Sequence, residues 1–305
     1  MRRTVRSPMP SRRMMLPLFA TLLAVAVAAL LAFVVASAQA PAASAQTTTS
    51  TEPDEPTFGV RCDFSHRNTD DPIVYPGKQG AAHSHDFFGN RSTKHDSTYA
   101  SLLKATTSGD PDGTTCTRPK DKSAYWIPTV KWNGTNIKAN RGIFYYRANG
   151  KTPGEVQAHP AGLKVVPNTS FEWRCGVGGT WSSTAPTQCS NGQLDVRIMF
   201  PDCSNGQLDS ADHRSHMAYA GLSDGIRKCP SAHPTPVPTL SAIISFAIPT
   251  STGKVTLSSG EASTLHADFF NAWDQAELKR LVKLCINDYT TPEARLRPED
   301  CKVPR

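Results

Sequence analysis

The sequence predicts a mainly β fold, sandwich or jelly-roll-like, with long disulfide-linked loops and one C-terminal helix. From residue 58 onward, short runs rich in β-branched and aromatic residues alternate with Gly, Pro and Asn, which is typical of strands joined by turns. Only one segment repeats apolar residues convincingly at helical spacing. Eight Cys follow the N-terminal region, which favours covalently linked loops.

The first forty residues predict export. Five Arg precede an uncharged apolar run at 16–35, and Ala-x-Ala sites follow at 36–40, so residues 1–40 are interpreted as a signal peptide. The alternative is an uncleaved membrane anchor, because about twenty apolar residues can span a bilayer. Residues 41–57 are rich in Ala, Ser, Thr and Pro and predict a linker, and residues 58–305 predict a single domain. We therefore expect a secreted, extracellular or cell-wall-associated protein that contacts a membrane only through an uncleaved signal segment.

The net charge of the exported part excludes one class of partner. The chain has 33 Lys and Arg and 26 Asp and Glu, and removing the five Arg of residues 1–40 leaves 28 basic residues against those 26. No basic cluster interleaved with aromatic residues is present, so we expect no nucleic-acid binding.

Strands are expected at 125–132, 143–147, 163–166, 171–174, 194–200 and 240–248. Pro128 predicts an edge or a bulge within the first of these segments, and the nearly all-apolar 240–248 predicts a central strand. The helix is expected at 274–288, where Asp274 and Glu277 form a capping pattern before apolar residues at helical spacing.

The even Cys count in an exported chain predicts four disulfides. Eight Cys allow 105 pairings. We favour the bridges between sequence neighbours, which are 62–116, 175–189, 203–229 and 285–301. Each would stabilise the fold by roughly 2–4 kcal/mol. No Cys-x-x-Cys is present, so a zinc ribbon or redox motif is not expected.

Ionisable residues gather in three motifs. His83 and His85 lie two residues apart before a Phe-Phe pair, and His266 and Asp268 repeat this arrangement near the other end. In an extended chain, side chains two residues apart point to the same face. The middle motif holds Asp212, His213 and His216, whose imidazoles share a face if this segment makes a helical turn.

Six ordered motifs carry a resemblance to a known family. They are HSHDFFGN at 83–90, KSAYWIP at 122–128, FPDC at 200–203, DHRSHMAY at 212–219, CPSAHP at 229–234 and LHADFF at 265–270. The chain thereby resembles the DUF1996 family of secreted bacterial and fungal domains of unknown function, over about residues 58–285. One departure is Ser204, where relatives carry Trp. The resemblance implies secretion but no particular activity.

The motifs allow three interpretations. The first is a divalent transition metal site, since His and Asp are good ligands for such ions, and its ligands would be His83, His85, His266 and Asp268. The second is metal-free acid–base catalysis on a glycan or an ester by His–Asp pairs. The third is structural, because buried His and Asp often tie loops together by hydrogen bonds. The candidate catalytic residues are His83, His85, Asp86, Asp212, His213, His216, His266 and Asp268.

Several enzyme classes are disfavoured. The chain lacks the Gly-x-Ser-x-Gly elbow of common serine hydrolases. Cleavage after Ala38 or Ala40 would not leave an N-terminal His, which argues against a copper monooxygenase of that kind. Two function classes stay open: a secreted enzyme acting on cell-wall or extracellular polysaccharide, and a non-catalytic carbohydrate-binding or structural module of the wall. We expect the three motifs to meet in one cleft.

Overall fold

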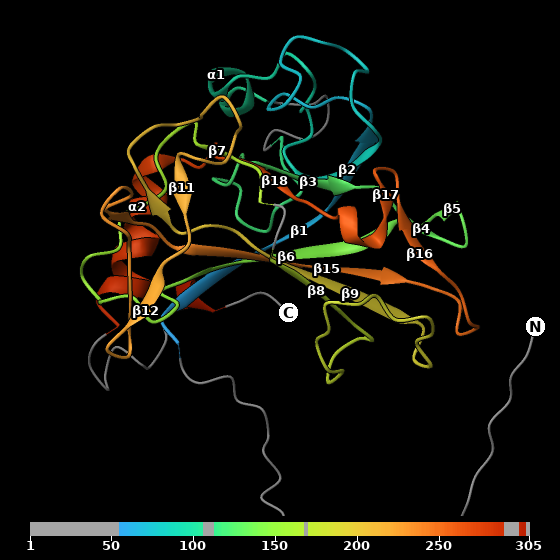
Figure 1. The fold of residues 1–305 in the computed structure, drawn as a ribbon. Coiled ribbons are helices and arrows are strands. Elements are labelled where there is room, and N and C mark those ends of the chain that lie inside the picture. Colours follow the sequence, from blue (N-terminus) through green and yellow to red (C-terminus); the bar gives the residue numbers. More distant parts are fainter. Residues whose placement is uncertain (1–54, 106–112, 168–169, 290–298, 303–305) are drawn as a thin grey trace, which may run out of the picture. The chain divides into compact units, whose positions relative to one another are not determined.

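The computed structural model describes residues 55–105, 113–167, 170–289 and 299–302. Its central feature is an antiparallel sheet of nine strands. In spatial order the strands are β7 (Lys164–Val165), β18 (Asp268–Phe270), β3 (Ala124–Pro128), β2 (His85–Gly89), β1 (Thr57–Asn68), β6 (Ala139–Arg147), β15 (Thr239–Ala247), β9 (Gln193–Met199) and β8 (Phe171–Arg174). Figure 1 shows these strands at the centre of the domain.

Smaller elements surround this sheet. A four-stranded sheet contains β17 (Gly260–Glu261), β16 (Val255–Leu257), β4 (Val130–Trp132) and β5 (Thr135–Asn136), and a three-stranded sheet contains β11 (Met217–Ala218), β10 (Cys203–Ser204) and β14 (Thr235–Pro236). A hairpin pairs β12 (Gly221–Ser223) with β13 (Ile226–Lys228). The helical elements are α1 (Tyr99–Leu103), α2 (Gln275–Val282), the π turn η2 (Lys283–Asn287) and the 3₁₀ turns η1 (Ala262–Thr264) and η3 (Glu299–Cys301).

Strand β1 makes the large sheet curl into a sandwich-like core. Its first half pairs with β6, whereas its last residues pair with β2, and the β1–β2 register shifts between Phe64 and Arg67. As a result Tyr125 of β3 stacks on Phe144 of β6, with ring centroids 3.9 Å apart, although two strands separate β3 from β6. The predicted mainly β class is confirmed.

A buried network of hydrogen bonds lies inside this core. The Tyr125 hydroxyl donates to Asp121 Oδ2 at 2.8 Å and lies 2.7 Å from the hydroxyl of Tyr146. Trp273 Nε1 donates to the Tyr146 hydroxyl at 2.9 Å. All four side chains are buried, and burial raises the pKa of Asp121 to about 7.

Alternation along β2 and β18 creates a second apolar layer on the other face of the sheet. Phe88 and Phe269 belong to the main core. Phe87 and Phe270 point the opposite way and pack in a smaller cluster with Trp126. One Phe of each pair therefore faces the main core, and His85 and Asp268 share the face of the other Phe because they lie two residues before it.

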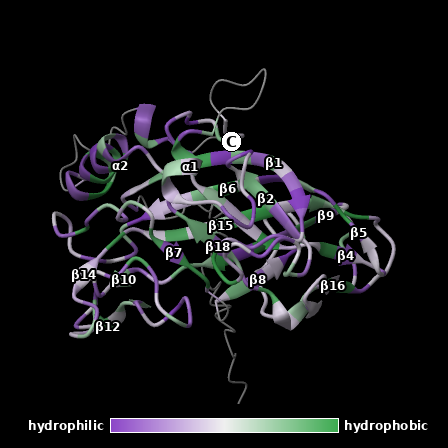
Figure 2. Ribbon diagram, turned by 90° about the horizontal axis from the view of Figure 1, so that it is seen from above, coloured by the Kyte–Doolittle hydropathy of each residue, from purple (hydrophilic) through white to green (hydrophobic). Residues whose placement is uncertain are grey.

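The C-terminal helix and its disulfide agree with the sequence. Asp274 accepts a hydrogen bond from the Glu277 backbone N–H at 2.9 Å and caps α2, which continues into η2. The stripe of Leu278, Leu281, Val282, Cys285 and Ile286 is buried. Figure 2 shows α2 with mixed hydrophilic and hydrophobic colours, whereas β15 is mainly hydrophobic.

The four disulfides are Cys62–Cys116, Cys175–Cys189, Cys203–Cys229 and Cys285–Cys301, which confirms the favoured pairing. Each closes a loop between neighbouring Cys of the sequence, and Cys285–Cys301 ties η2 to η3.

Three expectations on individual segments remain to be compared. The segment 125–132 breaks after Pro128, so β3 joins the large sheet and β4 joins the four-stranded one. The signal peptide at 1–40 and nearly all of the linker at 41–57 lie outside the described residues. In the described ranges, no helix has the length and apolar character needed to cross a membrane.

Candidate functional site

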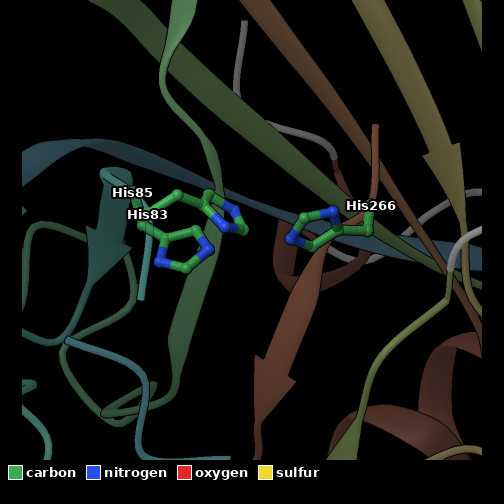
Figure 3. Close-up of side chains that lie close together, drawn as sticks. All are labelled: His83, His85 and His266. Atoms are coloured by element: carbon green, nitrogen blue, oxygen red, sulfur yellow. The ribbon is translucent and has the colours of Figure 1, made fainter. Parts of the chain in front are cut away.

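Three imidazoles converge at one end of the second apolar layer. His83 lies just before β2, His85 is its first residue, and His266 lies two residues before β18. The ring centroids are 4.3 Å apart for His83 and His85, 5.1 Å for His83 and His266, and 5.9 Å for His85 and His266. Figure 3 shows the His83 and His85 rings next to each other, with His266 approaching from a separate segment.

Strand pairing explains why these rings meet. Strand β3 lies between β2 and β18, so the two similar motifs share a sheet without pairing directly. His85 pairs with Pro128, and Asp268 pairs with Trp126. Because Trp126 and Pro128 are two residues apart, both pairs place their side chains on the same face of the sheet. The His266 ring, two residues before Asp268, reaches this face as well.

The donor atoms of the cluster have few partners within the protein. Ligand nitrogens of His83, His85 and His266 all lie within 4.8 Å of one another. Among the described residues, His83 Nε2 and both nitrogens of His85 are buried without a well-formed hydrogen bond, although the Asp70 backbone interacts weakly with His85. His266 Nδ1 lies 3.0 Å from the carbonyl oxygen of Thr264, to which it can donate, and this leaves its Nε2 as an acceptor.

The carboxyl groups of Asp71 and Asp268 lie close to the His85 ring. Donor atoms of Asp71, His85 and Asp268 also lie within 4.8 Å of one another, and all three side chains are buried. Asp268 is 1% exposed, and neither of its carboxyl oxygens has a hydrogen-bond partner among the described residues. Asp71 Oδ1 accepts from the backbone N–H groups of Ile73 and Val74 at 2.8 and 2.9 Å.

Burial sets the protonation of these groups. It lowers the pKa of His83 to about 4, lowers that of His85 well below its ordinary range, and lowers that of His266. It raises the pKa of Asp71, and it raises that of Asp268 well above the ordinary range. The imidazoles are therefore neutral near pH 7, which is the form that ligates metal ions.

Asp86 lies away from this cluster, although it follows His85 directly. It points to the other face of β2, where Arg67 donates to Oδ2 at 2.9 Å and Thr129 donates to Oδ1 at 2.8 Å. Alternation along the strand turns Asp86 away from the cluster, and its hydrogen bonds tie β2 to neighbouring segments.

The middle motif lies beside the cluster and does not supply its ring of donors. His216 is buried, and its two nitrogens lie 2.9 Å from Ser210 Oγ and 2.7 Å from the Lys164 carbonyl oxygen. His213 Nδ1 lies 2.8 Å from Asp209 Oδ1. Asp212 accepts hydrogen bonds from within its own turn, including the Ser215 backbone N–H at 2.9 Å. The expected meeting of all three motifs is therefore wrong for Asp212, whose carboxylate serves the local turn, and for His216, whose ring lies between Ser210 and the Lys164 carbonyl oxygen.

Sequence reasoning missed Asp71. It lies in an Asp-Asp-Pro turn, and such turns usually need an Asp only to bind their own backbone, as Asp71 Oδ1 also does here. No local pattern distinguishes it, since its closeness to Asp268 depends on how the loop after β1 covers the sheet.

The comparisons with known proteins give one match. A family model described as "Domain of unknown function (DUF1996)" matches residues 71–273, a range that contains the three imidazoles and both carboxyl groups. No curated protein matches the chain, and no solved structure does.

Proposed function

The chain belongs to the DUF1996 family, and since the family's description assigns no activity, we propose a function from the chemistry of the His cluster. His83, His85 and His266 bind a divalent transition metal ion. The protein is an exported metal-dependent enzyme that hydrolyses extracellular or cell-wall polysaccharide. The observation that carries this proposal is the convergence of three neutral imidazoles, in which His83 Nε2 and both nitrogens of His85 are buried without a hydrogen-bond partner among the described residues.

The donor set fits such an ion. Three protein ligands with one open position are typical of catalytic zinc sites, and imidazole also suits copper, iron and nickel. The contact between His266 Nδ1 and the Thr264 carbonyl is the kind of outer support that fixes the tautomer and orientation of a ligating His. A buried nitrogen without a partner costs about 1–3 kcal/mol, and binding of an ion would remove this penalty.

The residues around the cluster supply the other parts of a hydrolytic site. A bound divalent ion would act as a Lewis acid and make water a better nucleophile near neutral pH. Asp268 lies close to His85, and burial raises its pKa, which favours the protonated carboxyl that can donate a proton. His83 and His266 are partly exposed, whereas His85 is fully buried. Substrate would therefore approach from the side of His83 and His266.

Export is part of the proposal. The four disulfides are typical of proteins that fold in an oxidising compartment, and the N-terminal forty residues have the pattern of a signal peptide.

The test is metal-dependent release of reducing ends. The exported protein is stripped with a chelator, reloaded separately with Zn²⁺, Cu²⁺ or Mn²⁺, and incubated with a panel of neutral and acidic polysaccharides. We expect hydrolysis only after reloading, and a loss of at least about 100-fold in His266→Ala. His233→Ala is the matched control, because His233 lies outside the cluster and contacts the Ser215 carbonyl oxygen.

Equal hydrolysis by the stripped protein and by His266→Ala would contradict the proposal. Stoichiometric metal binding and glycan binding without hydrolysis would instead favour the non-catalytic wall module.

A further inference from the structure

Arg214 lies near the segment that carries His266 and Asp268. Its Nε donates to the Val166 carbonyl oxygen at 3.0 Å, and Val166 packs in the second apolar cluster with Phe270. The next residue, Pro167, accepts from the Ala267 backbone N–H at 3.2 Å, and Ala267 lies between His266 and Asp268. Arg214 therefore contacts the segment that is hydrogen-bonded to the backbone between His266 and Asp268.

The turn that carries Arg214 is held by hydrogen bonds to the Asp212 carboxylate. Asp212 Oδ1 accepts from the backbone N–H of Arg214 at 3.1 Å and that of Ser215 at 2.9 Å, and also from the Ser210 hydroxyl at 2.7 Å. His213 has a φ of 58°, a left-handed conformation that a non-Gly residue adopts at a cost. Backbone strain of this kind persists where surrounding contacts enforce it, often at functional sites. The Asp212 carboxylate thus fixes the backbone on which Arg214 is carried.

The guanidinium of Arg214 lacks an acidic partner. Among the residues that the structure describes, it makes no ion pair, and the only hydrogen bond from its side chain is the one from Nε. By contrast, Arg67 pairs with Asp86, and Arg174 pairs with Asp195. The two terminal NH₂ groups of Arg214 are donors in the planar fork that matches a carboxylate.

A hollow of about 110 Å³ adjoins this guanidinium. Its lining consists of Arg214 and mainly apolar side chains, which are Val165, Val166, Pro167, Pro201, Met217 and Tyr219. The Tyr219 hydroxyl donates to the Met199 carbonyl oxygen at 2.9 Å, which fixes the ring, and the residue is 38% exposed. A fixed aromatic ring beside apolar side chains suits packing against the C–H face of a sugar, and Arg214 lines the same hollow.

We propose that Arg214 and this hollow form a subsite for a carboxylated sugar, so that the preferred ligand is an acidic polysaccharide built from uronate units. The uronate carboxylate accepts hydrogen bonds from the Arg214 fork, while its ring packs on Tyr219. A phosphate dianion fits less well than a carboxylate monoanion, because Arg214 is the one cationic side chain in the lining of the hollow. The inference deepens the proposed function, but ligand binding can be tested without the metal.

The experiment measures binding of oligogalacturonate and of its methyl ester to the chelator-treated exported protein by calorimetry. The ester keeps the sugar rings and removes the charge. We expect the acid to bind at least about 10-fold more tightly than the ester. Arg214→Gln should weaken acid binding by about 10- to 100-fold and abolish the preference, and Arg214→Lys should fall between. Arg280→Gln on α2 is the control and should change neither affinity.

Three results would overturn the subsite: equal affinity of the natural protein for acid and ester, a preference that survives in Arg214→Gln, or displacement of the oligomer by inorganic phosphate at lower concentration than by free galacturonate. Acid-selective, Arg214-dependent binding without metal-dependent hydrolysis would refute the proposed function alone. Hydrolysis without acid selectivity would refute the subsite alone.

Discussion

The buried carboxyl of Asp121 offers a prediction that depends only on the core, and Asp121→Asn is its perturbation. Asp121 is 0% exposed, accepts from the Tyr125 hydroxyl at 2.8 Å and from the Ser123 backbone N–H at 3.0 Å, and has its pKa raised by burial to about 7. Asn keeps the shape of the side chain and cannot ionise.

The direction of the pH effect follows from linkage. Between pH 3.8, the ordinary value for Asp, and about 7, the folded protein keeps Asp121 protonated while the unfolded chain ionises it. The stabilising contribution is therefore complete below pH 3.8 and is lost as the pH rises through about 7. At 1.36 kcal/mol per pKa unit, this rise is equivalent to about 4 kcal/mol.

Urea unfolding of the disulfide-intact protein, followed by Trp fluorescence with chelator present, measures this effect. The unfolding free energy of the natural protein minus that of Asp121→Asn should fall by about 4 kcal/mol from pH 4 to pH 8, because only the natural protein loses stability through Asp121. The buried imidazoles make stability rise with pH, opposite to the effect of Asp121, but they do so equally in both proteins. The difference between the two proteins therefore isolates Asp121. A difference that does not vary with pH would refute the reasoning.

Two further substitutions test the assignment of polar residues to structure. Asp86→Ala should lower the free energy of unfolding by roughly 2–3 kcal/mol, since it removes the charged partner of Arg67. The number of metal ions bound per protein should stay unchanged. Loss of the metal would contradict the position of Asp86 on the other face of β2. Lys151→Met should cost about 3–5 kcal/mol in urea unfolding, because it leaves Asp202 buried without the ammonium group that lies 2.6 Å away. Only part of this loss should be recovered in Lys151→Met with Asp202→Leu, because the Ala220 backbone N–H and the Thr239 hydroxyl then lose their acceptor. No change in the stability of the single variant would contradict the account.

Local patterns were enough to predict much of the fold. Apolar runs marked β9 and β15, and the Asp274 cap with its apolar spacing marked α2. Strand β1 was missed, because Thr57–Asn68 mixes charged and polar residues and bends between two neighbours. Its first four residues are all buried and its last five are all half-buried, so no single alternation of burial runs along it.

The candidate site was predictable in part. The two-residue spacing placed His83 beside His85, and the similar motif at His266 suggested a shared location. The actual meeting depends on β3, which lies between the two motifs and sets their register through Trp126 and Pro128. Such long-range pairing leaves no local signal. The same limit explains why Asp71 was missed.

The position of a bound ion tests the central claim most directly. Crystals of the protein soaked in Zn²⁺ or Cu²⁺, and measured at the absorption edge of the metal, should give one strong anomalous peak. We predict that it lies about 2.0–2.1 Å from a nitrogen of each of His83, His85 and His266, and that it disappears in His266→Ala. An ion bound elsewhere, or a fully soaked crystal with no peak among the three imidazoles, would contradict the account.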